Sequence, residues 1–411
     1  MQKEYIVEKS NQIALNVTAG KVDSYREKGE TKCTVRVYDQ GKIGVAGALG
    51  DADFKKLEEQ AVAKLQDGIP YPCRLNAGVK KSIIKDKPII EYQKIIPSAK
   101  RLAKKVSVAC PRFLVNGKVK INNLSGSYKN SADTDLKYEN NSLSVSFLLK
   151  DKDSSNVFDA SYGAELRTYG AVTENKIVAD VKMLHDAFFS EKISLPDGEY
   201  PVIMSPYDIL AHIFKDFVAE YYVSNGSLFS GKLGEKIFNE NFNVASDRNP
   251  STSRTSFYDD EGEIAPDYRA HIIKNGVFKN VINNKDTATT YNLPLAKTAS
   301  ASYDGVPGIG LGGIYCKSTS PDLKTLLGDQ KAIYIAITSG GDITTDGVVG
   351  MPVQLAFLVE NGKVVARLND FSASGNVKDI LGKDFIGISA KDIYSATTDE
   401  VLVAKMKIIN N

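Results

Sequence analysis

Apolar residues recur at every second position through much of residues 11–49, as in Ile13, Leu15 and Val17. A period of two places one face of each strand in a core and the other outside it. Three glycines, Gly20, Gly29 and Gly41, interrupt the alternation and indicate turns. We therefore expect the chain to begin with a β-meander.

Other segments repeat their apolar residues at the spacing of a helix. After the meander, Asp51 or Asp53 can cap a helix that Gly68 ends. Residues 98–110 form a second stripe, whose opposite face is basic; we interpret that face as solvated rather than as a nucleic-acid footprint. Further helices are predicted over residues 178–191 and, as one long helix, over residues 208–222.

Strand patterns also cover residues 119–168, with turns predicted at Asn122-Asn123 and at 150–153, and most of the second half. Asn275-Gly276 and Asn361-Gly362 favour tight hairpins, because both residues of such a turn need positive φ. A turn cluster at 195–199 is the best boundary. We predict an α+β fold, with a helix-flanked N-terminal sheet domain over residues 1–195 and a β-rich domain over residues 196–411.

The predicted helix over 208–222 carries a histidine but no convincing metal site. At about 100° per residue, a broad apolar face includes Ile213 and Phe217, whereas Asp208, His212 and Asp216 fall on the opposite face. One straight helix face seldom surrounds a cation, so we expect these three residues to be exposed and to bind no metal.

The run Asp259-Asp260-Glu261-Gly262 places three carboxylates side by side. Such carboxylates repel one another unless they are solvated or meet a cation. A solvated turn is the favoured interpretation, and recognition of a peptide amine or backbone is the sharper alternative. Four glycines in loops are further candidates for substrate binding: Gly312, Gly313, Gly340 and Gly341.

Composition adds limits rather than a function. The 411 residues contain 52 Lys plus Arg and 50 Asp plus Glu, and the net charge of +2 makes nucleic acid an unlikely obligatory partner. The first residues have no apolar signal region and no stretch is long enough to span a membrane, so we expect a cytoplasmic protein. Four dispersed cysteines indicate reduced thiols.

Several short motifs follow one another in the order of a known family. In the second half these are 226–234, 254–262, 273–276, 360–362 and 374–379, and in the first half 20–25 and 47–51. Each motif is weak alone, but together they resemble the TldD/PmbA peptidase family. In the metallopeptidase branch of that family the 208–222 helix carries HExxxH. Here Ile213 stands in place of the glutamate and Phe217 in place of the second histidine, while His212 matches the first.

The resemblance implies a PmbA/TldE-like member without the metal. The family's third ligand, a late cysteine, is also missing, since no cysteine follows Cys316. Membership implies a dimer enclosing a peptide-sized chamber, and a peptidase complex in which a TldD-like partner holds zinc. We expect no cofactor and no catalytic residue in this chain.

Two hypotheses of different class follow. The first is a non-metal subunit of a cytoplasmic metallopeptidase complex that acts on unfolded peptides, paired with a TldD-like chain or with itself. The second is a stand-alone peptide-binding or regulatory protein, in keeping with the family's history as a modulator of DNA gyrase. Under the first, the loops at 308–313 and 342–347 are expected near the shared chamber.

Overall fold

The computed structural model describes residues 1–85, 87–395 and 400–410. The N-terminal half is built on a seven-stranded sheet in the order β3-β2-β1-β5-β6-β4, with β7 also paired to β6. Its elements are β1 (Gln2–Thr18), β2 (Lys21–Asp39), β3 (Lys42–Leu49), α1 (Phe54–Ala63), β4 (Lys80–Ile84), α2 (Tyr92–Ala109), β5 (Phe113–Asn130), β6 (Asp135–Asp151), β7 (Ala160–Leu166) and α3 (Ala171–Phe188).

The C-terminal half contains a nine-stranded mixed sheet and a smaller four-stranded sheet, in the order β12-β11-β10-β15. Its helices are α4 (Pro206–Ile213), α5 (Ala219–Val223), α6 (Lys285–Thr290), α7 (Leu323–Leu327) and α8 (Val377–Ile380). Its strands are β8 (Lys192–Ile193), β9 (Gly198–Met204), β10 (Val244–Asp247), β11 (Arg269–Lys274), β12 (Val277–Phe278), β13 (Ala299–Ser300), β14 (Gly308–Ile309), β15 (Ile314–Cys316), β16 (Ala332–Thr338), β17 (Asp342–Ile343), β18 (Val348–Glu360), β19 (Lys363–Leu368), β20 (Phe371–Asn376), β21 (Phe385–Ser389) and β22 (Val401–Asn410).

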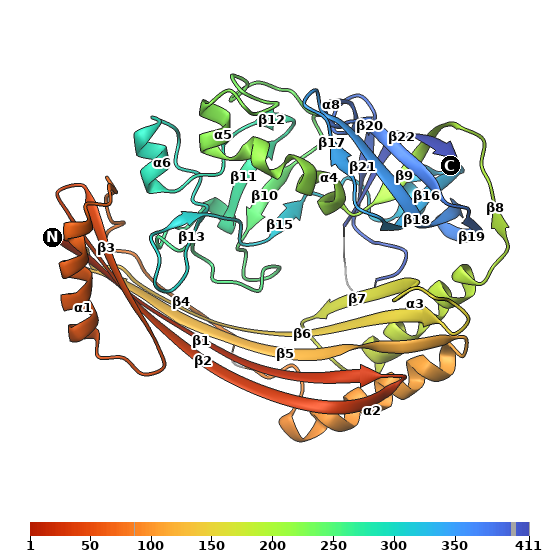
Figure 1. Cartoon of the computed structure of the whole chain (residues 1–411), viewed down its shortest axis with the longest axis horizontal. Coiled ribbons are helices and arrows are strands. Elements are labelled where there is room, and N and C mark those ends of the chain that lie inside the picture. Colours follow the sequence, from red (N-terminus) through yellow and green to blue (C-terminus); the bar gives the residue numbers. More distant parts are fainter. Residues whose placement is uncertain (86, 396–399, 411) are drawn as a thin grey trace.

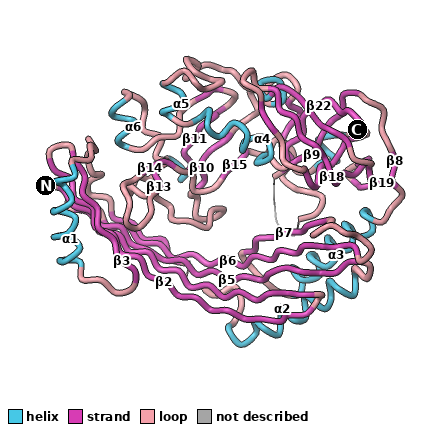
Figure 2. The backbone as a smooth tube through the Cα atoms, viewed as in Figure 1, coloured by secondary structure: helices cyan, strands magenta, loops and turns pink. Residues whose placement is uncertain are grey.

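The N-terminal sheet is a long curved ribbon, and the C-terminal half lies above its concave side (Figure 1). Helix α1 lies at one end of the ribbon and α2 and α3 at the other, as the helix colouring in Figure 2 shows. Odd-numbered positions of β1 contribute Ile13, Leu15 and Val17 to a core with α2 and α3. Since side chains alternate along a strand, the even positions of β1 face the other way.

The C-terminal half contacts the ribbon near both of its ends. At one end, Leu355 and Phe357 of β18 join the core formed by α2 and α3. At the other end, the Tyr303 carbonyl accepts a hydrogen bond of 2.6 Å from the Thr34 hydroxyl. A Cβ atom on Gly47 of β3 would lie only 2.3 Å from that carbonyl oxygen, so this close approach requires glycine.

Most strand predictions are confirmed, and so is the α+β class. The meander exists, and Gly20 and Gly41 turn it with positive φ. Two predicted turns are wrong. Gly29 lies inside β2 opposite Asn11, and Asn122-Asn123 lies inside β5 opposite Asn11 and Gln12 of β1. Pairing with β1 on both sides of these positions outweighs the local turn signal.

Helix and hairpin predictions hold with longer bounds. Asp53 caps α1, accepting hydrogen bonds from the backbone N–H groups of Lys55 and Lys56. Helices α2 and α3 begin six or seven residues before the predicted starts, at Tyr92 and Ala171. Both Asn-Gly turns have positive φ at both residues and join β11 to β12 and β18 to β19.

Two smaller expectations concern the surface and the thiols. The basic face of α2 is exposed, and its Arg101 and Lys105 pair with the buried Glu174 of α3. All four cysteines are free, as predicted. Within the described residues, no helix is both long and apolar enough to cross a membrane. The predicted domain boundary falls between β8 and β9, although β8 pairs with β19 of the C-terminal sheet.

Candidate functional site

The predicted helix over 208–222 is broken, which corrects the single helix expected there. Helix α4 ends at Ile213, a 3₁₀ turn covers Phe214–Phe217, and α5 begins only after Val218, whose backbone is extended. The break is a tertiary effect. Ile282 donates a backbone hydrogen bond to the Phe217 carbonyl and accepts one from Ala219, so the chain pairs briefly as a strand.

The predicted faces therefore hold only over α4. Ile213 is fully buried and Phe217 is nearly so, as expected. Asp216 was expected to be exposed but is buried, whereas Phe214, which belongs to the predicted apolar face, is 37% exposed. The Asp216 carboxylate accepts a 2.7 Å hydrogen bond from the Leu228 backbone, which gives it a structural role in the following loop.

His212 lies beside one of the predicted glycine loops. A Cβ atom on Gly341 would lie 3.2 Å from His212 Cε1, so the two residues are in contact, and Gly340 precedes them with a positive φ. Burial raises the pKa of Asp208, and the His212 charge opposes that shift. The structure thus joins His212 to Gly341, far from the other candidates.

The positions that match HExxxH cannot hold a metal. Ile213 has no donor atom, and the Phe217 ring stacks on Phe229 with centroids 5.2 Å apart. A catalytic zinc takes three protein ligands. Among the described residues, no group of three His, Cys, Asp or Glu side chains is placed to bind a metal ion. The residues present therefore do not fit the metal that the family name implies.

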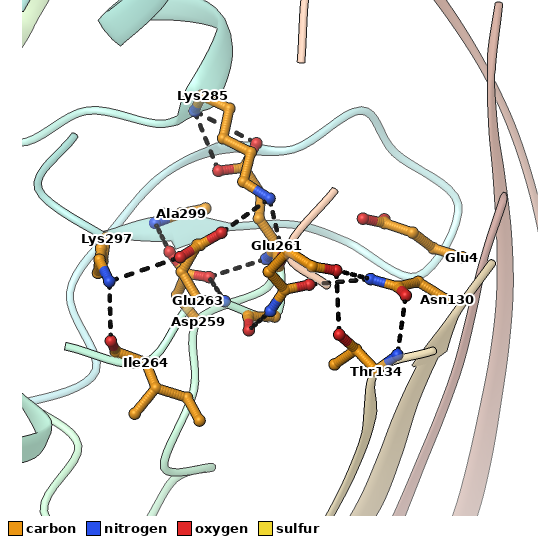
Figure 3. A network of polar contacts seen from close by, with 12 residues as sticks. Glu4, Asn130, Thr134, Asp259, Glu261, Glu263, Ile264, Lys285, Lys297 and Ala299 are labelled. Atoms are coloured by element: carbon orange, nitrogen blue, oxygen red, sulfur yellow. Dashed lines mark hydrogen bonds and ion pairs between the residues drawn. The ribbon is translucent and has the colours of Figure 1, made fainter. Parts of the chain in front are cut away.

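The acidic run lies at the junction between the two halves, and the expectation of a solvated turn is wrong. Asp259 and Glu261 are 0% and 1% exposed. Asp259 accepts backbone hydrogen bonds from Glu261, Glu263 and Ala299 at 2.9 to 3.1 Å. Figure 3 shows these carboxylates turned inward among their donors. The local sequence could not reveal this, because the run is hydrophilic throughout.

Glu261 is held by groups from distant parts of the chain. It accepts hydrogen bonds from the Lys285 backbone, at 3.0 Å, and from the Tyr71 hydroxyl. Burial, followed by repulsion from Asp259, raises the pKa of Glu261 to about 8, and burial raises that of Asp259 to about 6. Lys285 also pairs with Glu263 at 3.1 Å. The pair thus binds a proton more readily than free carboxyls do.

The ribbon supplies a matching buried network. Glu4 of β1 pairs with Arg36 of β2 at 3.3 Å and accepts hydrogen bonds from the Tyr38 and Tyr128 hydroxyls. Arg36 donates to the Asp260 carbonyl, which links this network to the acidic run. We refer to Glu4, Arg36, Tyr38, Tyr128, Asp259 and Glu261 as the buried junction.

Gly262 closes the same contact. It has a φ of +73°, and a Cβ atom there would lie 2.5 Å from the Tyr128 ring. Sequence reasoning found the acidic run but missed its partners on β1, β2 and β5. Only the alternation of charged and apolar residues on β1 hinted that one face of that strand meets another surface.

Of the candidate substrate-binding residues, Asp260 and Gly312 line one common cavity, which the other candidates do not line. The cavity has a volume of about 280 Å³ and lies between the concave face of the ribbon and the C-terminal half. Arg248 forms part of its wall, and a Cβ atom on Gly312 would lie 2.6 Å from Arg248 Cγ. We call this space, with Glu8, Tyr138, Arg248 and Asp260 on its wall, the inner cavity.

A larger groove lies along the same side of the ribbon. It has a volume of about 760 Å³ and runs between the end of β7 with α3 on one side and β10 with β15 on the other. Its lining includes Arg167, Lys176, Arg254 and Tyr315. Neither Gly313 nor the loop with Gly340 and Gly341 lines either space. The candidate glycines therefore belong to different parts of the molecule.

With the fold and site described, known proteins can be compared. The model of the PmbA/TldA metallopeptidase C-terminal domain matches residues 197–410, just over half of the chain. The chain belongs to this family.

Two solved structures share the fold over nearly all of both chains. TldE from Thermococcus kodakarensis superposes with a TM-score of 0.79 at 19% identity, covering 100% of this chain and 97% of that one. A Thermotoga maritima protein proposed to modulate a DNA gyrase gives a TM-score of 0.75 at 20% identity, with coverages of 99% and 96%.

A metalloprotease of Methanocaldococcus jannaschii is 28% identical over 198 residues, which are 46% of this chain and 43% of that relative. The chain thus matches less than half of the length of that relative. This chain shares its family with these relatives and its fold with the solved structures.

Proposed function

We propose that this chain is the subunit without metal in a PmbA/TldD-type peptidase complex that acts on unfolded peptides. The observation that supports it best is that packed hydrophobic side chains, Ile213 and Phe217, stand in place of the glutamate and the second histidine of HExxxH. Packing of this kind holds α4 and the following turn in place but provides neither a metal ligand nor a general base. A TldD-like partner with intact HExxxH supplies the zinc.

The division of labour follows from what peptide hydrolysis requires. The reaction needs an activated water and a group to take its proton. Of the three HExxxH residues this chain keeps His212 alone, and Ile213 rather than a glutamate follows it directly. What its own residues do is bind: the groove along β7 and the inner cavity offer charged and polar groups to an extended chain.

The proposal is tested by mixing two purified chains. Alone, this chain should bind no stoichiometric transition metal and should not cleave a fluorescently labelled unfolded peptide. Hydrolysis should appear when a chain with HExxxH is added, and the two should co-purify. Chelator-sensitive cleavage by the homogeneous chain, abolished by His212→Ala, would overturn the proposal.

A variant that restores the motif tests the packing itself. Ile213→Glu with Phe217→His should not create activity and should destabilise the fold by several kcal/mol, because an unpaired carboxylate and imidazole enter an apolar core. Phe214→His is the matched control, since Phe214 is partly exposed next to both positions. Equal melting temperatures for both variants and the parent would show that Ile213 and Phe217 face solvent-filled space.

The runner-up function is a stand-alone regulatory protein, and the likeness to the Thermotoga protein is what favours it. It predicts that the chain alone changes the supercoiling rate of purified gyrase. The peptidase proposal predicts no such effect. We further propose a cytoplasmic dimer, homomeric when the chain is expressed alone, which light scattering at micromolar concentration tests; a monomer there would count against the chamber.

A further inference from the structure

The inner cavity is lined by polar side chains that have few partners within the protein. The Glu8 carboxylate forms no hydrogen bond and no ion pair with any described residue, and the Tyr138 hydroxyl forms no hydrogen bond with one either. Arg248 forms no ion pair within that part of the chain, and its buried Nε has no hydrogen-bond partner. Buried polar atoms are nearly always satisfied in native proteins. The unpaired Arg248 Nε in the wall of this cavity therefore points to a ligand, and the exposed Glu8 carboxylate is free to meet it.

The position of Glu8 supports this interpretation. Its side chain is exposed, yet the surrounding protein raises its pKa, and repulsion from Asp260 adds to the shift, while Lys32, Arg36 and Arg248 oppose it. The same two causes, enclosure first, raise the pKa of Tyr138 to beyond its usual range, with Glu8 and Asp260 as the charges responsible. Both carboxylates thus face one small space, and Tyr138 lies beside them.

Asp260 is only partly committed to the fold. Its side chain accepts one hydrogen bond, of 2.6 Å, from the Ala301 backbone. Arg248 on the opposite wall donates to the Ser256 hydroxyl at 3.0 Å and, weakly, to the Ala299 carbonyl. Among the described residues, the cavity thus presents two carboxylates that are in no ion pair and a guanidinium that has no carboxylate partner.

We propose that the inner cavity binds the ammonium group of a peptide, which sits between Glu8 and Asp260 while Arg248 donates to the adjacent carbonyl. A primary ammonium has three donors and suits two facing carboxylates, and a guanidinium suits a peptide oxygen. The volume of about 280 Å³ lies just below the range of roughly 300–1,000 Å³ typical of small-molecule pockets. It accommodates the end of a chain or one long side chain.

The proposal rests on the proposed function only in taking a peptide as the ligand. The ammonium can come from an amino terminus or from a lysine side chain. At the rim, Glu30 is already occupied, since it pairs with Lys28 at 3.3 Å and with Lys32 at 3.6 Å. Lys9 also lines the cavity and is the one lysine there without an ion pair among the described residues. Because its charge repels an ammonium group, binding is best measured at moderate ionic strength, where salt screens that repulsion.

Calorimetric titration of the full chain tests the site with three probes. The first is a short alanine–glycine peptide amide with a free amino terminus, the second is its N-acetylated form, and the third is an N-acetylated form with one lysine. We expect the free amine to bind at least about tenfold more tightly than the acetylated peptide, as for loss of one charge-assisted contact. Glu8→Gln should remove that difference, whereas Glu59→Gln, an exposed change on α1, should keep it.

Each outcome decides the matter. Preference for the lysine probe, lost in Glu8→Gln, supports the ammonium site and assigns it to side chains. Equal affinity for all three probes, an unaffected Glu8→Gln variant, or no binding of any probe at millimolar concentration overturns it. The proposed function is judged separately, because co-purification and hydrolysis with a chain carrying HExxxH do not depend on these titrations.

Discussion

Glu4 and Glu8 lie on the same face of β1, four residues apart, but differ in burial and in hydrogen bonding. Glu4 is 1% exposed and is satisfied by Arg36, Tyr38 and Tyr128. Glu8 faces the inner cavity with no partner among the described residues. The acidic run divides in the same way, since Asp259 and Glu261 are enclosed by donors while Asp260 reaches the cavity.

The partners of a carboxylate distinguish one that stabilises the fold from one that can bind a ligand. A buried carboxylate whose acceptor positions are filled by the chain serves the fold, because removing any donor leaves an uncompensated charge. An exposed carboxylate that lines a cavity without a partner from the chain adds little to stability and can bind a ligand, which then stabilises the folded state. The buried junction and the inner cavity are neighbours that exemplify the two cases.

The largest expected effect comes from breaking the buried junction at its cation. Arg36→Met leaves Glu4 buried without its ion-pair partner and should lower the free energy of unfolding by about 3–5 kcal/mol. Arg248→Met, the matching change in the inner cavity, should cost less, about 1–2 kcal/mol, because Arg248 loses hydrogen bonds to Ser256 and Ala299 but no ion pair. Urea unfolding measures both. Similar losses for the two variants would erase the distinction between the regions.

Gly262 tests how tightly the buried junction is closed. Gly262→Ala places a methyl group against the Tyr128 ring at a residue with positive φ, and should cost about 1–3 kcal/mol. Gly41→Ala is the control, since Gly41 has a similar φ of +74° but no atom within 4 Å of the added methyl. Its loss should be confined to the backbone term, about 1 kcal/mol. Thermal melts of the two variants give the comparison.

The pH dependence of stability should report on Glu261. Its folded pKa of about 8 lies above the value in an unfolded chain, so the native state holds a proton that the unfolded state releases. That contribution is fully present below the unfolded pKa and is lost as pH rises to about 8. The slope is limited to about 1.4 kcal/mol per pH unit for one proton. Glu261→Gln should flatten the curve; an unchanged slope would point to another group.

The smallest effect is expected at Glu8. Glu8→Gln removes no hydrogen bond or ion pair and relieves repulsion from Asp260, so the free energy of unfolding should stay within about 0.5 kcal/mol of the parent. Urea unfolding at low salt is the measurement. A loss of 2 kcal/mol or more, roughly the size of a broken buried hydrogen bond, would mean that Glu8 is part of the fold after all.

Local chemistry explains what the sequence could predict. The Asp53 cap, the two Asn-Gly hairpins and the alternation on β1 depend on residues close together in the chain, and all are present. The burial of Ile213 and Phe217 also followed from their place on an apolar stripe. Periodicity identifies such features because a single element decides them.

Features decided by distant partners could not be found in this way. The break at Val218 depends on Ile282, and the burial of Asp259 depends on Ala299 and on the junction with the ribbon. Asn122-Asn123 looks like a turn but is held straight by a strand more than a hundred residues earlier. No window of sequence contains both members of these pairs.

The contact of the Tyr303 carbonyl with Gly47 has a mechanical consequence. Strand β1 spans 17 residues, or roughly 55 Å. The C-terminal half contacts the ribbon near both of its ends, through Tyr303 at one end and through Leu355 and Phe357 at the other. A ribbon held at both ends cannot bend away from the C-terminal half at its middle. The inner cavity and the groove therefore keep a set width. Under the proposed function, a peptide enters them as an extended chain, because the two halves do not separate to admit a folded domain.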